Sequence, residues 1–175
     1  ALQAAECARA ADEPAAVTLA CLLHDVGNTL PARDAWRAKT GDEPPLLMSP
    51  KNEPIGYAKH SDMGGVFLEH VGFAPEVASA VALHVSAKRA LVTIEPSYMN
   101  ELSQASIDTL HHQGGPLSPS ALAEFRSHPG SGVALRLRRY DDKAKHPGQD
   151  VPRLETYEDM IYEHLRAQSM MRVER

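Results

Sequence analysis

The residues of this chain best suited to chemistry are a His-Asp pair near its N-terminus. His24 and Asp25 stand in the stretch LACLLHDVGN, at the end of an apolar segment. A charged aspartate beside four aliphatic residues is costly to bury without a partner. A metal ion removes that cost, because it compensates the carboxylate and accepts a lone pair from a neutral imidazole. The pair alone is weak evidence, since chance and helix C-capping explain most such dipeptides.

Three further side chains of metal-binding type lie in later predicted helices. His60 opens a helix that contains a Gly-Gly pair, where another backbone can approach closely. His84 lies on the apolar side of VASAVALHVSAKRAL, and Asp141 follows a helix face in LRLRRYDDKAK. Taken singly, His60 could be a helix cap and His84 a core histidine. Asp141 could be a solvated partner of Arg138. Helical metal sites are built from ligands on separate helices, so the set predicts a metal site made of His24, Asp25, His60, His84 and Asp141.

The ligand types narrow the metal and the nuclearity of this site. Imidazole and carboxylate donors without thiolates suit iron, manganese or zinc, and not a closed structural zinc site. One ion needs about three or four protein ligands, and the predicted set is larger. Because the carboxylate of Asp25 can bridge two ions, we expect a dinuclear centre. Ligand type alone does not fix which metal is bound.

Cations lie one turn away from two of the proposed ligands. Lys88 comes four residues after His84, so both project from the same helix face. Arg138 comes three residues before Asp141 and likewise shares a face with it. Both would hold a substrate with anionic oxygens beside the metal, although surface charge is the alternative role. Ser106 and Gln113, in LSQASIDTLHHQGGP, supply neutral donors if the Gly-Gly-Pro turn brings them inward. Capping and turn formation are their alternative roles.

The elements that must position these residues are predicted to be helices. A first helix is expected over residues 1–11, and Asp12 is expected to cap a second that runs to Val26 and ends at Gly27. The Pro and Gly content of residues 28–57 predicts a long connection, typical of a lid or binding loop. Ser118 is predicted to cap a helix with Pro119 in its first turn. Other helices are expected over residues 60–71, 75–91, 102–110, 131–145 and 154–171, and since no segment alternates with period two, the domain is predicted to be all-α.

Composition limits the class of protein. A length of 175 residues with 43% hydrophobic residues fits one globular domain. The net charge of −5 gives no support for a nucleic-acid partner, and we expect no membrane span and no signal peptide. Cys7 and Cys21 suit buried thiols in a reducing cytosol, so a cytoplasmic location is expected. The first helix starts without a capping residue, from which we expect that an N-terminal segment is missing.

Five motifs in this order resemble a known family. LLHDVGN, HSDMGG, LHVSAKRAL, LSQASIDTLHHQGGPLS and LRRYDDKAK are similar to the HD-domain mixed-valence diiron oxygenases that cleave 1-hydroxyphosphonates, relatives of myo-inositol oxygenase. The HD pair would name only a superfamily of mostly phosphohydrolases, and the HVSAKR and QGGP blocks carry the narrower assignment. The resemblance implies a single HD-domain helical bundle over residues 1–175.

The resemblance also implies a cofactor and a set of roles. Two iron ions, as Fe(II)/Fe(III), would be bound with Asp25 as the bridge, and dioxygen would be the co-substrate. The implied iron ligands are His24, Asp25, His60, His84 and Asp141, and the implied phosphonate contacts are Lys88, Ser106, Gln113 and Arg138. The family has one further histidine ligand, a gating tyrosine and a glutamate before the HD helix. In this sequence those positions would fall upstream of Ala1, which agrees with the expected missing segment.

Asn28, one turn past His24, is a further expected substrate-binding residue. In relatives that act on a primary 2-amino substrate, this position resembles a histidine near the amine. Asparagine is smaller and leaves room for a methylated ammonium group, which binds best to carboxylate or aromatic surfaces. Trp36, Tyr57 and Tyr98 lie in predicted connecting segments that could provide such surfaces, although loop aromatics more often pack a loop against the core.

The reaction implied by the resemblance is oxidative C–P bond cleavage in organophosphonate catabolism. A small hydroxyphosphonate, 1-hydroxy-2-(trimethylammonio)ethylphosphonate, would give glycine betaine and phosphate, with His24, Asp25 and Lys88 as catalytic residues. One alternative is the same chemistry on 2-amino-1-hydroxyethylphosphonate, which gives glycine. Another is a phosphohydrolase in which a metal-bound hydroxide attacks a phosphate ester. A non-catalytic HD module, which needs no complete ligand set, is the third.

Overall fold

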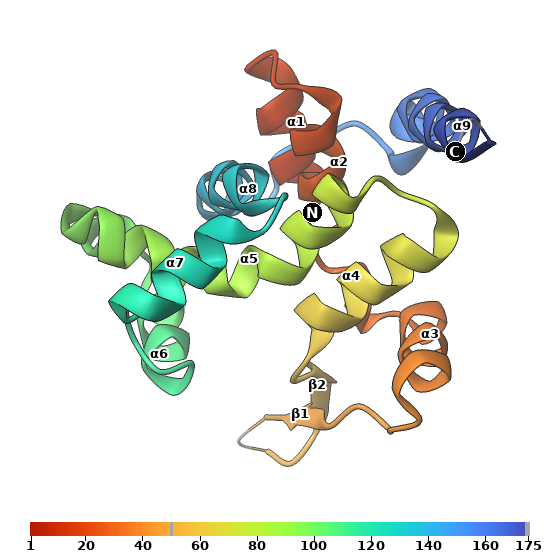
Figure 1. Cartoon of the computed structure of the whole chain (residues 1–175). Helices are drawn as coiled ribbons and strands as arrows, with labels where there is room; N and C mark the ends of the chain where they lie inside the picture. The colour runs from red at the N-terminus through yellow and green to blue at the C-terminus, as the bar shows by residue number, and fades with distance from the viewer. Residues whose placement is uncertain (50, 174–175) are drawn as a thin grey trace.

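Helices make up most of this chain, as its sequence predicts. The computed structural model describes residues 1–49 and 51–173, without the side chains of residues 105 and 112. In Figure 1 one long helix, α5, crosses the middle of the molecule, and the other helices surround it. The predicted all-α class is confirmed.

The central helix α5 spans Pro75–Ile94 and forms its most extensive contacts with α4 (His60–Val71) and α8 (Ser131–Lys143). By length and composition α5 could cross a membrane, but 56% of its apolar window is buried inside the fold. A helix that is apolar on most of its faces is expected at the centre of a globular core. The helix therefore fits the role of a core element that other helices pack against.

The N-terminal helices are α1 (Leu2–Ala10) and α2 (Ala15–Leu23). The prediction that Asp12 caps α2 is wrong, because Asp12 has a φ of 55° in the turn before the helix, and Pro14 occupies the N-cap position. The predicted end at Gly27 is also wrong. The α-helix ends at Leu23, and a 3-10 turn, η1 (Val26–Asn28), contains the glycine.

Residues 28–57 are not the long irregular connection that their composition predicts. They form η1, helix α3 (Leu30–Thr40) and an antiparallel hairpin of strands β1 (Leu46–Met48) and β2 (Pro54–Tyr57). A proline in the first turn and Gly41 in the left-handed conformation at the C-cap are ordinary helix boundary signals that delimit α3. The strands are too short for their period of two to be recognised against a proline-rich background.

The remaining elements complete the bundle around α5. Ser118 caps α7 as predicted, since its Oγ accepts a hydrogen bond from the backbone N–H of Ala121. Helix α8 ends two residues before the expected boundary, at Lys143. The other elements of this part are η2 (Pro96–Glu101), α6 (Gln104–His112), α7 (Pro119–Ser127), η3 (Leu154–Tyr157) and α9 (Glu158–Val173).

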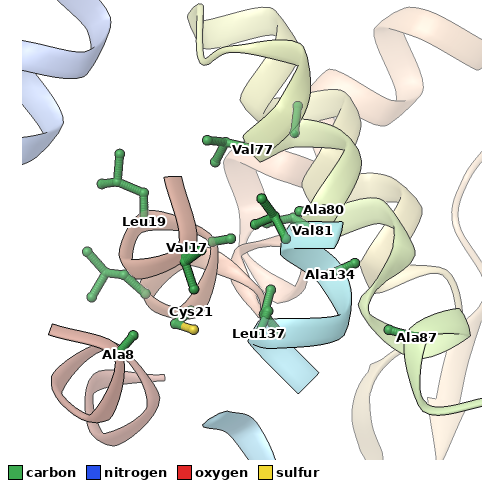
Figure 2. Close-up of a cluster of buried hydrophobic side chains, with 14 of the residues drawn as sticks. Ala8, Val17, Leu19, Cys21, Val77, Ala80, Val81, Ala87, Ala134 and Leu137 are labelled. Atoms are coloured by element: carbon green, nitrogen blue, oxygen red, sulfur yellow. The ribbon is translucent and has the colours of Figure 1, made fainter. Parts of the chain in front are cut away.

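The hydrophobic core lies where α1, α2, α5 and α8 meet. Figure 2 shows side chains from these four helices facing one another, many of them alanine or valine. Small side chains let helix axes approach closely, which brings the ends of α2 and α8 near the middle of α5. Cys21 is fully buried in this core, and burial raises the pKa of its thiol to about 12, whereas Cys7 is only partly buried. The core therefore fixes the helices that carry the predicted site.

Candidate metal centre

The predicted ligands come from four elements that the core holds together. His24 and Asp25 directly follow α2, His60 is the first residue of α4, His84 lies in the middle of α5, and Asp141 lies near the end of α8. His24 and His84 are buried, with 4% of each residue exposed, whereas Asp25 is exposed. The buried side chains thus meet solvent at the Asp25 carboxylate.

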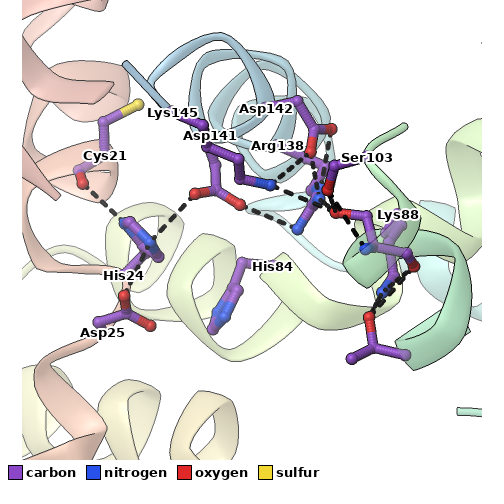
Figure 3. Close-up of polar contacts among 12 residues, drawn as sticks. Cys21, His24, Asp25, His84, Lys88, Ser103, Arg138, Asp141, Asp142 and Lys145 are labelled. Atoms are coloured by element: carbon purple, nitrogen blue, oxygen red, sulfur yellow. Dashed lines mark hydrogen bonds and ion pairs between the residues drawn. The ribbon is translucent and has the colours of Figure 1, made fainter. Parts of the chain in front are cut away.

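The structure brings all five side chains into one group. The Nε2 atoms of His60 and His84 lie 3.2 Å apart, and Asp25 Oδ1 lies 3.9 Å from His60 Nε2. On the other side, Asp25 Oδ2 lies 3.2 Å and Asp141 Oδ1 lies 3.6 Å from His24 Nε2 (Figure 3). Asp25, His60 and His84 each offer a ligand atom within 4.8 Å of the other two. The two oxygens of Asp25 therefore face different histidines, as a bridging carboxylate requires.

All three histidines are oriented by the backbone in the same way. In each, Nδ1 contacts the carbonyl oxygen three residues earlier: Cys21 at 2.8 Å, Tyr57 at 3.1 Å and Val81 at 2.7 Å. A carbonyl oxygen only accepts, so Nδ1 must carry the proton in each ring. In the neutral imidazole, Nε2 is then an unprotonated lone pair aimed into the group. Fixing the tautomer through the second ring nitrogen is the usual support of a metal-bound histidine.

These geometries fit a bound metal ion. With Nδ1 protonated, the Nε2 atoms of His60 and His84 confront each other at 3.2 Å with lone pairs and no hydrogen between them. Such a contact repels unless a cation lies close to both nitrogens. The oxygens of Asp25 supply negative charge beside them. Nitrogen and oxygen donors of this kind suit iron, manganese or zinc, so Asp25, His60 and His84 form a candidate metal site.

The electrostatics of the group favour an anionic carboxylate and a neutral central histidine. When His24 is protonated, its Nε2–H donates to Asp25, and this hydrogen bond, together with the nearby histidines, holds the pKa of Asp25 well below its usual range. Burial, and then the charge of His24, lower the pKa of His84. Burial opposes protonation of His24, but its hydrogen bond to Asp25 and the charges of Asp25 and Asp141 outweigh that effect and raise its pKa. A carboxylate and a deprotonated imidazole are the forms that bind metals.

Glycines allow the backbones that carry these ligands to come close together. A Cβ on Gly27 would lie 1.8 Å from the carbonyl oxygen of His60, and a Cβ on Gly65 would lie 2.7 Å from Cβ of Ala82. Neither position can accept a side chain without displacing a helix. The predicted close approach at the Gly-Gly pair of α4 is therefore confirmed, and Gly27 sets the distance between the His-Asp pair and His60.

Three cations lie beside the ligand group: Lys88, Arg138 and Lys145. We call these three residues the cation cluster. Lys88 is buried and its Nζ donates to the carbonyl oxygen of Ser106 at 3.1 Å. Arg138 Nη2 and Lys145 Nζ each lie 3.3 Å from Ser106 Oγ. Burial is the main reason that the pKa of Lys88 is lowered to about 8. All three cations thus contact Ser106, in the first turn of α6.

The comparisons with known proteins agree with this arrangement. Over 90% of the chain it is 33% identical to a hydroxymethylphosphonate dioxygenase of Gimesia maris, of which it covers 71%. Over 86% of the chain it is 30% identical to a [1-hydroxy-2-(trimethylamino)ethyl]phosphonate dioxygenase (glycine-betaine-forming) of Leisingera caerulea, of which it covers 69%. The chain belongs to the phosphonate dioxygenase family.

Two further comparisons concern a third relative and the protein-family models. The chain is 32% identical to an uncharacterized protein, L432, of Acanthamoeba polyphaga mimivirus, and spans 62% of that protein's length. No protein-family model matches the chain. The predicted resemblance to hydroxyphosphonate-cleaving oxygenases is confirmed at the level of the family, and the two dioxygenases above are named for different phosphonates.

Asp142 is a residue of this site that the sequence did not point to. Its carboxylate contacts Arg138 Nε at 3.0 Å, Arg138 Nη2 at shorter range, Lys145 Nζ at 3.1 Å and the hydroxyl of Tyr98. Asp141 occupies the other side of the guanidinium, with Oδ2 at 2.9 Å from Nη1. The spacing of four residues between Arg138 and Asp142 on a helix is a signal that could have revealed this ion pair.

Gln113 and Asn28 are placed differently from the other expected substrate contacts. Gln113 is the C-cap of α6, at the opposite end of that helix from Ser106, and its Oε1 is buried without a partner among the described residues. Asn28 is exposed in η1, and its Oδ1 accepts a hydrogen bond from the backbone N–H of Tyr57 at 3.1 Å. Their contacts with substrate stay predictions.

Two of the three aromatic side chains considered for a cationic head group already face a cation of the protein. Lys59 Nζ lies 5.4 Å from the ring centroid of Trp36, and the guanidinium carbon of Arg139 lies 5.7 Å from that of Tyr98. A ring face that binds one cation is a poor second site for another. Tyr57, three residues before His60, is the better aromatic candidate.

Proposed function

We propose that this protein uses dioxygen to cleave the C–P bond of a small 1-hydroxyphosphonate, with two iron ions as its cofactor. The observation that carries the proposal is the convergence of the Nε2 atoms of three histidines on Asp25, next to the buried cations Lys88 and Arg138. The membership of the phosphonate dioxygenase family supports the same reaction. Incorporation of one oxygen atom into each product balances the conversion of hydroxyphosphonate and dioxygen into a carboxylic acid and phosphate.

The proposed division of roles follows the charges. His24, Asp25, His60, His84 and Asp141 would hold the iron ions, which supply the redox chemistry when bound. Lys88, Arg138 and Ser106 would bind the phosphonate oxygens and so place the carbon that bears the hydroxyl beside the metal. Arg138 is suited to this role because its guanidinium also contacts Asp141, one of the proposed ligands. The anion site and the metal site are thus joined through one ion pair.

The substrate that we propose first is 1-hydroxy-2-(trimethylammonio)ethylphosphonate, which would yield glycine betaine. Its support is the Leisingera caerulea relative and the small asparagine at position 28. The Gimesia maris relative, named for hydroxymethylphosphonate, makes a substrate without an amino group the first competitor. The 2-amino compound, which would yield glycine, is the second.

The test is an oxygen-uptake assay of the iron-loaded protein on these three hydroxyphosphonates. We expect oxygen consumption in equal amount to the phosphate released, with the highest kcat/KM for the trimethylammonio compound. Uptake that favours hydroxymethylphosphonate would keep the reaction and overturn the proposed substrate. No uptake with any of the three would overturn the reaction.

A phosphohydrolase remains the rival activity, because the same ligands and cations would serve hydrolysis of a phosphate ester. An anaerobic assay separates the two reactions. We expect no phosphate release from hydroxyphosphonates or from phosphate monoesters without dioxygen. Steady anaerobic hydrolysis of a monoester would favour the rival.

A further inference from the structure

Each histidine of the metal site is oriented by a backbone carbonyl group, and the three carbonyl groups are held in place in different ways. For His24 and His84 that carbonyl belongs to Cys21 in α2 and Val81 in α5, where the helix itself fixes it. For His60 it belongs to Tyr57, the last residue of β2 and outside any helix. The hairpin that contains Tyr57 is short and its strands are mostly exposed. The orientation of His60 therefore depends on what fixes the end of the hairpin.

Asn28 provides that support. Its Oδ1 accepts a hydrogen bond from the backbone N–H of Tyr57 at 3.1 Å. The N–H of Tyr57 therefore faces Asn28, and the carbonyl oxygen of Tyr57 faces His60. The strand passes very close to the carboxamide, because a Cβ on Gly56 would lie 2.6 Å from Oδ1. The preceding residue, Gly27, packs against the carbonyl of His60. Two adjacent residues of η1 thus contact both the start of α4 and the segment that orients its first side chain.

We propose that Asn28 is a positioning residue for the metal site: its carboxamide oxygen holds Tyr57 so that the Tyr57 carbonyl aligns His60 toward Asp25 and His84. The inference rests on the proposed metal-dependent function, and it gives Asn28 a role that does not require contact with the substrate. Loss of a group that orients a metal-bound histidine typically weakens metal binding by about 10- to 100-fold. Because Asn28 acts through a peptide group, the lower end of that range is expected.

The test compares Asn28→Ala with Asn28→Asp, which keeps an acceptor oxygen at nearly the same place. Asn100→Ala is the matched control, since Asn100 is exposed in η2. Affinity for Fe(II) is measured anaerobically by competition with a chelator, and the thermal transition of the metal-free protein reports folding. We expect Asn28→Ala to weaken Fe(II) binding by about tenfold, and Asn28→Asp and the control to bind as the wild type does. Equal affinity of Asn28→Ala and wild type, or equal losses in both Asn28 variants, would overturn the inference.

A second measurement separates positioning from contact with the head group. Hydroxymethylphosphonate has no amino substituent, whereas the trimethylammonio compound has one next to the carbon that reacts. A positioning role predicts the same fold-loss of kcat/KM for both substrates in Asn28→Ala at limiting iron. A loss restricted to the trimethylammonio compound would reject positioning in favour of head-group recognition. A wild-type chain that binds no Fe(II) would instead overturn the proposed function itself, and this inference with it.

Discussion

The metal-ligand group and the cation cluster lie side by side, yet their charges are balanced in opposite ways. In the ligand group, Nε2 lone pairs and carboxylate oxygens converge, so the group has an excess of electron donors. In the cation cluster, the guanidinium of Arg138 is already paired with Asp141 and Asp142. The first region needs a cation to complete it, whereas the second carries its own counterions.

This difference indicates how the two regions respond to a ligand. Metal binding satisfies donors that are already aligned, so little rearrangement is needed. An anion that binds Arg138 must instead share the guanidinium with two carboxylates. Lys88 contrasts with Arg138, because its described hydrogen bonds go to the neutral oxygens of Ser106 and Thr109. Four predictions test this comparison.

The largest effect is expected for Asp25→Ala. This change removes the carboxylate that faces both His24 and His60, and leaves the nitrogens without negative charge between them. Metal affinity should fall by more than about 100-fold, which exceeds the usual loss when a residue that only orients a metal ligand is removed. Metal analysis after desalting measures the loss, with the exposed Asp34→Ala as the control. Full iron occupancy in Asp25→Ala would contradict the bridging role.

Lys88→Ala and Arg138→Ala should weaken phosphonate binding while iron stays bound. A charged hydrogen bond contributes about 1.5–3 kcal/mol, which corresponds to a loss of about 10- to 100-fold in affinity. Calorimetric titration of the anaerobic, iron-loaded protein with hydroxymethylphosphonate measures it. Arg139→Ala is the control, because Arg139 pairs with Glu95 on the surface. Wild-type affinity in both variants would remove the cation cluster from the substrate site.

Asp142→Asn tests whether the cation cluster is held by its own counterions. The variant leaves the buried guanidinium of Arg138 with one carboxylate partner in place of two, and it weakens the contact with Lys145. We expect a loss of about 2 kcal/mol in the free energy of unfolding, or a Tm lower by about 4–8 °C. Thermal denaturation measures this change, with the exposed Asp159→Asn as the control. An unchanged Tm would show that Asp142 does not hold Arg138 in place.

The fourth prediction is a pH dependence of stability that arises from Lys88. Its pKa is lowered to about 8, mainly by burial, whereas an unfolded lysine titrates near about 10.4. Between these values the unfolded chain binds more protons, so the free energy of unfolding contributed by Lys88 rises with pH across this window. Denaturant unfolding from pH 7 to 10.5 should show the wild type gaining stability relative to Lys88→Met. A difference that does not vary with pH would contradict the lowered pKa.

The sequence was a good guide to the ligands because helical spacing relates residues to a shared face. His84 is buried as its place on the apolar side of the helix predicted, and Lys88, four residues later on the same face of α5, is buried beside it. The sequence was a poor guide to residues 28–57, because the proline and glycine that mark the ends of α3 and the hairpin also give this segment the composition of a loop. The positioning role proposed for Asn28 could not be predicted from the sequence, since it depends on a contact between residues 29 positions apart.

The carbonyl three residues before each histidine has a consequence for protein design. For His24 and His84 the imidazole and its supporting oxygen lie on a single helical turn, so the direction of Nε2 is encoded within four consecutive residues. Such a turn could be moved into another helix as a unit, with the spacing of the helix axes then deciding how far apart the nitrogens stand. His60 could not be transplanted in this way, because its support comes from a strand.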